Sequence, residues 1–264
     1  SRRRRAAPRR PPPHGLPSHR PPTGVHPPPH SPPLVATFGG GAEGQMRFTR
    51  MLWGVSFETA GLVIDESLIS EICHEVVDNS TPPMFMYHIH EKFTAAVDGK
   101  TSATGAGCGP DFTGGHWDPT GACGPASGNA ACKACTAWKL PYNCSPENFK
   151  WWEPNQYNPP NLHACELGDL SNMFGMLEAW EADGAGKVFV KGKTGLAQMS
   201  ARAGTISDKY SDWMYPCGPH GIGFTHATPD GGPSLEMIKR KSIVVHCGST
   251  YEAKGARLLC AELV

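Results

Sequence analysis

The pattern of apolar and polar positions along the chain predicts short strands rather than long helices. Apolar and polar residues partly alternate from Met46 to Leu62, where two glycines interrupt the pattern, which indicates a strand pair with one solvent-facing side. The run from Met84 to Tyr87 reads as a buried strand that continues to His90. Between turn signals, further strands are expected at Lys187–Lys191, Leu196–Ala201, Leu235–His246 and Ala256–Val264. Many short strands punctuated by Gly and Pro indicate an all-β sandwich or barrel.

Two stretches depart from this pattern. The segment from Val63 to Val77 has apolar spacings that fit either a helical turn or a strand, and both remain open. Residues 94–161 are loop-like, and a loop this long is unusual in a compact domain unless function or disulfides hold it. Its cysteines favour disulfide stapling, although Cys132 and Cys135 also form a CxxC pair that could be a redox dithiol or half of a zinc knuckle.

The first 44 residues have a different composition from the remainder. Residues 1–42 contain seven arginines, twelve prolines, four histidines and no acidic residue. So little aliphatic surface cannot offset the entropy of ordering, which predicts a disordered tail over 1–44 and one folded domain over 45–264. The Arg-rich start could also serve as a polyanion contact or targeting arm, and the histidines as a loose metal collector.

Charge and cysteine content limit the classes of function. Lys and Arg (24) balance Asp and Glu (24), so no global field points to nucleic acid or to a membrane surface. The sequence contains no run of 18 apolar residues, so no membrane-spanning helix is predicted. It also shows no apolar segment of the kind found in a signal peptide. Ten cysteines favour an oxidising compartment, so an extracellular or secretory location is expected. A processed or truncated chain, beginning at Ser1, would reconcile that location with the missing signal peptide.

Four histidines form the candidate metal-binding set. In a strand His88 and His90 project from the same face. His116 lies in a glycine- and proline-pinned turn, and His246 ends a continuous apolar strand. For each histidine alone, a hydrogen-bonded core residue is the simpler interpretation, but together they could converge on one metal. Neutral imidazoles suit copper and zinc.

Five motifs in order carry a resemblance to a known family. They are His88-Ile89-His90, Gly114 to Pro119, Gly168-Asp169-Leu170-Ser171-Asn172, Val244-Val245-His246, and Gly255 to Cys260. In this order they resemble the copper/zinc superoxide dismutase family, with large insertions between them. The resemblance implies a Greek-key β-barrel of the immunoglobulin-like sandwich type.

The resemblance also implies roles for single residues. His88, His90 and His246 would bind copper, and His116 would be the bridging histidine that takes up a proton when copper is reduced. Arg257 would attract and orient superoxide. Cys260 would be half of the family disulfide, with Cys108 as its natural partner.

The zinc half departs from the family pattern. Asp169 is present, but the position three residues before it holds Glu166, where zinc-binding members have a histidine. His163 remains as a displaced candidate ligand. Only ten residues separate His246 from Arg257, a shorter loop than zinc-binding relatives carry. The chain therefore looks most like the copper-only extracellular branch, in which Glu166 would hydrogen-bond His116, and zinc is expected to be absent.

The implied activity is copper-catalysed disproportionation of superoxide to dioxygen and hydrogen peroxide. Two alternatives stay open. One is a superoxide-dismutase-like module that binds copper or has a structural role without turnover. The other is a secreted disulfide-rich module in which the insertion between Cys108 and Cys165 binds a partner. The sequence does not indicate an oligomeric state.

Overall fold

The structure is a computed structural model, and it describes residues 32–51, 54–74, 83–94, 99–119, 122–130, 132, 142, 144–145, 165–182, 186–197, 235–248 and 255–264. Among the predicted features, most of the tail, Cys135 and His163 lie outside the described residues.

The first three strands form an antiparallel ladder. They are β1 (Leu34–Thr37), β2 (Ala42–Met51) and β3 (Gly54–Asp65). The register of β2 against β3 shifts at Gly44, which has a φ of 114°. A Cβ at Gly44 would lie 2.4 Å from the carbonyl oxygen of Gly61, so only glycine fits at this bulge.

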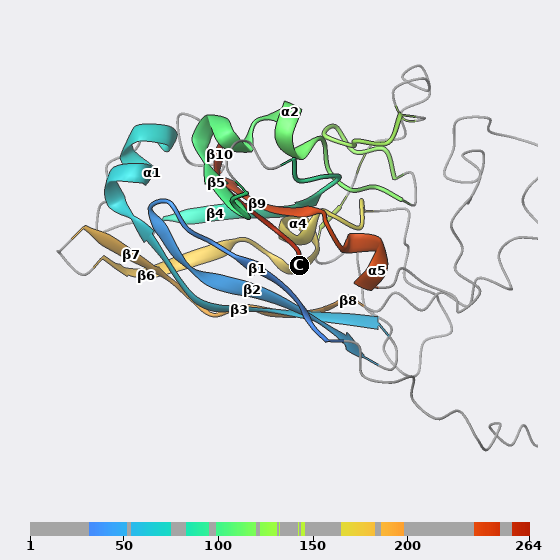
Figure 1. Cartoon of the computed structure of the whole chain (residues 1–264), viewed down its shortest axis with the longest axis horizontal. Coiled ribbons are helices and arrows are strands. Elements are labelled where there is room, and N and C mark those ends of the chain that lie inside the picture. Colours follow the sequence, from blue (N-terminus) through green and yellow to red (C-terminus); the bar gives the residue numbers. More distant parts are fainter. Residues whose placement is uncertain are drawn as a thin grey trace, which may run out of the picture. The chain divides into compact units, whose positions relative to one another are not determined.

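Two layers of strands enclose the core (Figure 1). In the first layer, β3 also pairs with β7 (Lys187–Val190) and β8 (Thr194–Ala197), and β7 pairs with β6 (Leu177–Ala182). The second layer contains β4 (Met84–His90), β9 (Ser242–Cys247), β10 (Arg257–Glu262) and β5 (Ser102–Thr104). All six residues of β9 are buried, which explains its continuous apolar run.

The two layers join at both sides. Val35 and Val264 exchange backbone hydrogen bonds of 2.9 and 3.3 Å, which connect β1 to the end of β10. On the other side β4 and β6 share only two residue pairs, and α4 (Leu170–Phe174) packs beside β4, where the Ser171 hydroxyl donates to the Tyr87 carbonyl at 3.0 Å. The strands therefore form a nearly closed antiparallel barrel with Greek-key neighbours such as β4 and β9, and the predicted all-β fold is confirmed.

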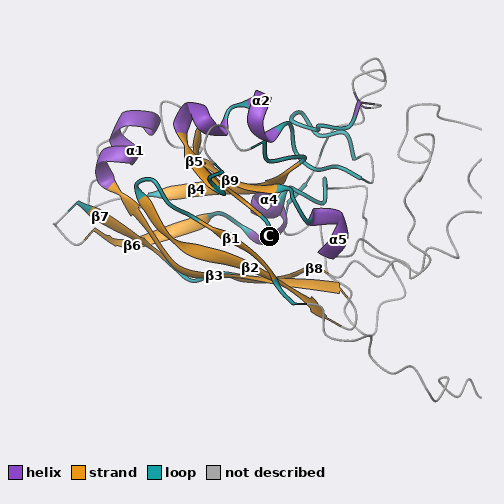
Figure 2. Ribbon diagram, viewed as in Figure 1, coloured by secondary structure: helices purple, strands orange, loops and turns teal. Residues whose placement is uncertain are grey.

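Helices are few and short (Figure 2). In the described part of the chain, the helices besides α4 are α1 (Glu66–Cys73), the 3-10 turn η1 (Gly105–Cys108), α2 (Pro110–Thr113) and α5 (Leu235–Ile238). α1 follows β3 directly, so the ambiguous segment from Val63 contains the end of a strand and then a helix. Among the described residues, no helix is both long and apolar enough to cross a membrane.

Four disulfides lie within the described residues. They are Cys73–Cys247, Cys108–Cys260, Cys123–Cys132 and Cys144–Cys165. The predicted stapling of the long insertion is confirmed by the last two, and Cys132 pairs with Cys123 rather than with its CxxC neighbour. Four such bonds are consistent with an oxidising environment.

Two sequence predictions are wrong in detail, and some short strands were not predicted. The predicted boundary at residue 44 is too late, because β1 lies before it and Leu34, Ala36 and Phe38 are buried in the core. The strand predicted from Leu235 begins only at Ser242, after α5 and a turn at Arg240 with a φ of 66°. Strands β5 and β6 were not predicted, and β5 lies inside the segment 94–161 that the sequence predicts to be loop-like. Each of these elements is only three to six residues long, and its state is decided by tertiary pairing rather than by local propensity.

Candidate metal centre

Strands β4 and β9 place three histidines on one face of the barrel wall. His88 lies opposite Val244 in the antiparallel ladder, and His246, two residues along, is therefore its diagonal neighbour on the same face. His90 lies two residues beyond His88 and also projects from this face. All three are buried, with 1–6% of each residue exposed.

A loop crossing the free edge of β4 delivers the fourth histidine. His116 forms an isolated bridge with His90, and the Trp117 N–H donates to the Ile89 carbonyl at 2.9 Å. The same edge receives Gly168, whose carbonyl accepts from the Ile89 N–H at 2.9 Å. A Cβ at Gly168 would lie 2.4 Å from the Ile89 carbonyl oxygen, so this approach requires glycine.

The four imidazoles converge within a small volume. One ring nitrogen from each of His88, His90, His116 and His246 lies within 4.8 Å of the others. The ring centroids of His88 and His116 are 4.1 Å apart, and the Nε2 atoms of His90 and His246 are 3.2 Å apart. These four residues are the group that the sequence predicted as metal ligands.

Backbone carbonyls hold two of these rings, His90 and His246, which we call the carbonyl-backed pair. His90 Nδ1 lies 3.0 Å from the Gly114 carbonyl oxygen, and His246 Nδ1 lies 2.9 Å from that of Gly255. Because a carbonyl oxygen only accepts, both Nδ1 atoms carry the hydrogen, and both Nε2 atoms present a lone pair. Two lone pairs facing each other at 3.2 Å repel unless a cation or a proton lies between them.

Buried carboxylates hold the other two rings, His88 and His116, which we call the carboxylate-backed pair. His88 Nε2 lies 3.3 Å from Asp169 Oδ1, and His116 Nδ1 lies 2.6 Å from Glu166 Oε2. Glu166 is 0% and Asp169 1% exposed. The inward-facing atoms are then Nδ1 of His88 and Nε2 of His116. His88 Nδ1 is buried and has no hydrogen-bond partner in the described part of the chain.

Burial keeps three of the rings neutral at pH 7. Desolvation lowers the pKa of His88 to about 4, although its hydrogen bond to Asp169 opposes part of this shift. Desolvation and the neighbouring histidines hold the pKa values of His90 and His246 well below the usual 6.5. Neutral imidazoles are the form that binds metal ions.

The two carboxyl groups differ in their electrostatics. Burial raises the pKa of Asp169, but hydrogen bonds from His88, Tyr142 and Asn172 outweigh this effect, so its pKa lies well below the usual range. Burial raises the pKa of Glu166, and its bond to His116 opposes the increase. Asp169 is therefore a fixed anion, whereas Glu166 depends on His116 for its charge compensation.

The donor set fits a metal ion of intermediate softness. Each ring uses its outer nitrogen on a carboxylate or carbonyl, which is the arrangement that metal-binding histidines require. Two nitrogens bound at about 2.0–2.1 Å to one ion at a tetrahedral angle lie about 3.3 Å apart, close to the 3.2 Å observed for His90 and His246. Four imidazoles without a carboxylate suit copper, zinc, nickel or iron rather than calcium or magnesium.

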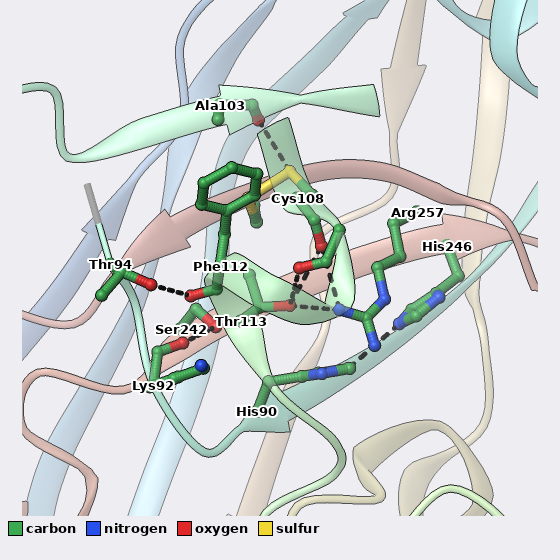
Figure 3. The surroundings of a disulfide bond; sticks show 12 residues. His90, Lys92, Thr94, Ala103, Cys108, Phe112, Thr113, Ser242, His246 and Arg257 are labelled. Atoms are coloured by element: carbon green, nitrogen blue, oxygen red, sulfur yellow. Dashed lines mark hydrogen bonds between the residues drawn. A yellow bond between two sulfur atoms is a disulfide. The ribbon is translucent and has the colours of Figure 1, made fainter. Parts of the chain in front are cut away.

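Arg257 lies beside this cluster at the start of β10 and is only half buried (Figure 3). Its guanidinium donates to the Cys108 carbonyl at 3.0 Å, to the Thr113 hydroxyl and to the Gly114 carbonyl at 2.8 Å. The Gly114 carbonyl also accepts from His90, so one oxygen atom connects the guanidinium to a histidine of the site. The Cys108–Cys260 disulfide, the pairing that the resemblance implied, anchors this segment to β10.

A second cluster combines Asp118 with Cys123 and Cys132. The two sulfur atoms form a disulfide, and the Asp118 carboxylate accepts from the backbone N–H groups of Ala122 and Cys123 and from the Ser127 hydroxyl. These contacts give the cluster a structural role in the loop that carries His116.

Sequence reasoning missed three contributors to the site. Tyr142 contacts both carboxylate-bearing residues, and the carbonyls of Gly114 and Gly255 hold His90 and His246. Only the motifs around the glycines gave any signal. His163, the displaced ligand candidate, lies outside the described residues. No protein-family model matches the chain, and no curated protein sequence matches it.

Proposed function

We propose that the protein is a copper-dependent superoxide dismutase of the secretory pathway or extracellular space. One observation carries the proposal: four imidazoles, each with its outer N–H on an acceptor, direct their lone pairs into one buried space. His88, His90, His116 and His246 would hold the copper ion. A copper ion held there would supply the one-electron redox chemistry that converts superoxide to dioxygen and hydrogen peroxide.

His116 suits the role of the proton carrier in this reaction. Its Nδ1–H is held by Glu166, so Nε2 is the atom that can take up and return a proton. Its side chain is 12% exposed, whereas the other three histidines are buried. Two superoxide ions and two protons give one dioxygen and one hydrogen peroxide, and His116 would supply one of these protons and water the other.

Arg257 suits the attraction of the substrate anion. Its guanidinium is permanently charged and lies next to His90 through the shared Gly114 carbonyl. A positive group in a partly desolvated position raises the local concentration of a small anion.

A single copper ion, without zinc, is part of the proposal. A second metal bridged through His116 would need its Nδ1 atom, and Glu166 already accepts a hydrogen bond from that atom. The Asp169 carboxylate is likewise occupied by donors.

Metal analysis and superoxide decay test the proposal. Purified protein is expected to bind one copper per chain and to accelerate superoxide decay, measured by pulse radiolysis. His116→Ala should abolish most of the turnover, because it removes both a copper ligand and the proton carrier. His74→Asn is the matched control, because His74 is exposed, and asparagine tolerates its φ of 54°.

The outcomes separate the candidate functions. Full activity in His116→Ala, or no copper uptake by the natural chain, would overturn the proposal. Tight copper binding without superoxide turnover would instead indicate a copper-binding module that lacks catalysis.

A further inference from the structure

Tyr142 links both carboxylate-bearing residues of the site. Its hydroxyl donates to Asp169 Oδ2 at 2.6 Å and accepts from the backbone N–H of Glu166 at 3.1 Å. Asp169 supports His88, and Glu166 supports His116. One phenol therefore connects the two supports of the carboxylate-backed pair.

The Asp169 carboxylate is saturated with donors. Oδ1 faces His88 Nε2 and the Asn172 N–H, each at 3.3 Å. Oδ2 accepts from Tyr142 at 2.6 Å and from Asn172 Nδ2 at 2.8 Å. A carboxylate offers about four acceptor positions, and these four contacts use them all. Asp169 is thereby kept as a support for His88.

A disulfide holds Tyr142 in place. Cys144, two residues after the tyrosine, is bonded to Cys165, which directly precedes Glu166. The ring also packs closely against Gly124, where a Cβ would lie 2.9 Å from a ring carbon of Tyr142. The insertion, and not the barrel, thus provides this contact.

We propose that Tyr142 is a positioning residue of the metal centre, acting through Asp169 on His88 and through Glu166 on His116. The proposal rests on the proposed function only in treating the four histidines as a copper site, and it does not require superoxide turnover. Loss of the hydroxyl would remove the shortest contact of the Asp169 carboxylate and the acceptor for the Glu166 N–H. The carboxylate-backed rings would then lose orientation, whereas the carbonyl-backed rings would not.

The test compares Tyr142→Phe with Tyr87→Phe by copper binding. Cu(II) affinity is measured by competition with a chelator, and the Cu(II) site by electron paramagnetic resonance. Tyr142→Phe is expected to weaken copper binding about tenfold, the lower end of the cost of losing an outer support, and to alter the copper signal. Tyr87→Phe is the matched control, because Tyr87 is a buried tyrosine beside His88 whose hydroxyl has no hydrogen-bond partner in the described region. It should leave both readouts unchanged.

A double-mutant cycle tests whether Tyr142 acts on copper binding through Asp169. In an Asp169→Asn background, Tyr142→Phe should have a smaller effect on copper affinity than in the natural chain. If Tyr142→Phe does not fold, difluorotyrosine at position 142 retains the hydroxyl but makes it a stronger donor, and should still shift the copper signal.

Several results would overturn the role of Tyr142. They are an unchanged affinity and signal in Tyr142→Phe, an unchanged signal with difluorotyrosine, an equal effect of Tyr87→Phe, or no copper binding by the natural chain. Copper binding that responds to Tyr142→Phe without any superoxide turnover would support the positioning role and reject only the proposed function.

Discussion

The two halves of the histidine cluster are built in different ways. His90 and His246 are oriented by main-chain carbonyls of segments attached to the barrel. His88 and His116 are oriented by two buried carboxylates on the segment 165–169, which a tyrosine and a disulfide from the insertion hold in place. The first half depends on backbone geometry alone, whereas the second depends on the identity of several side chains.

Because of this difference, substitutions can affect folding stability and metal binding separately. A carbonyl support cannot be removed by substituting a side chain, and it carries no titratable charge. A carboxylate support can be removed by one substitution, and its charge increases the basicity of the ring that it holds. Substitutions in the insertion should therefore change metal binding more than folding, and substitutions of barrel-wall residues other than the histidines should do the reverse.

The largest expected effect comes from removing, one at a time, the disulfide that lies near each half of the site. Replacing Cys108 and Cys260 by serine opens a loop with a sequence separation of 152, which costs up to about 5 kcal/mol of unfolding free energy in the chain-entropy description. Replacing Cys144 and Cys165 opens one of 21 residues and costs about 3 kcal/mol. The loss of copper affinity should follow the opposite order. It should be larger without Cys144–Cys165, because Cys165 directly precedes Glu166. Denaturant unfolding and copper titration measure both, and identical orders in the two assays would contradict the division into halves.

Acid should destabilise the metal-free protein next most strongly. The pKa of His88 is about 4 in the folded state and about 6.5 unfolded, so the unfolded chain binds more protons between these values. Stability is therefore fully present above pH 6.5 and is lost as the pH falls through 4. His88 alone contributes about 3 kcal/mol. His90 and His246 act in the same direction, while Glu166, whose pKa is raised, opposes them.

Unfolding free energies of metal-free protein at pH 7, 6, 5 and 4 measure this loss. Bound copper should protect the protein in the upper part of the range, because protons and metal compete for the same lone pairs. A flat profile between pH 7 and 4 would show that the rings are not buried as neutral groups.

A smaller effect is expected from Glu166→Gln. The amide oxygen can still accept from His116, but the negative charge is lost, so copper affinity should fall about 10- to 100-fold, or about 1.4–2.7 kcal/mol. Glu262→Gln is the matched control, because Glu262 is also buried but pairs with Arg240 instead of a histidine. Equal losses in the two variants would indicate a general response to removing buried charge.

The four histidines could be predicted from sequence, but the carbonyl supports of His90 and His246 and the tyrosine behind the carboxylates could not. The alternation of His88 and His90 specifies a shared face, and the apolar run before His246 specifies a buried strand. The family resemblance added Glu166. Nothing local identifies Tyr142, because its partners are more than twenty residues away and depend on a disulfide pairing that spacing alone cannot select. In the fold, β1 and α5 were missed because four residues are too few for either period to show.

The register of β4 against β9 has a consequence for folding. Because His246 is the diagonal neighbour of His88, a slip of one residue would turn one strand's histidines to the opposite face of the sheet. A metal ion that needs His88, His90 and His246 together can bind only the native pairing. Metal present during refolding would therefore favour the correctly aligned strands by mass action. The rate of metal uptake during refolding would then report the rate at which β4 and β9 pair in the native register.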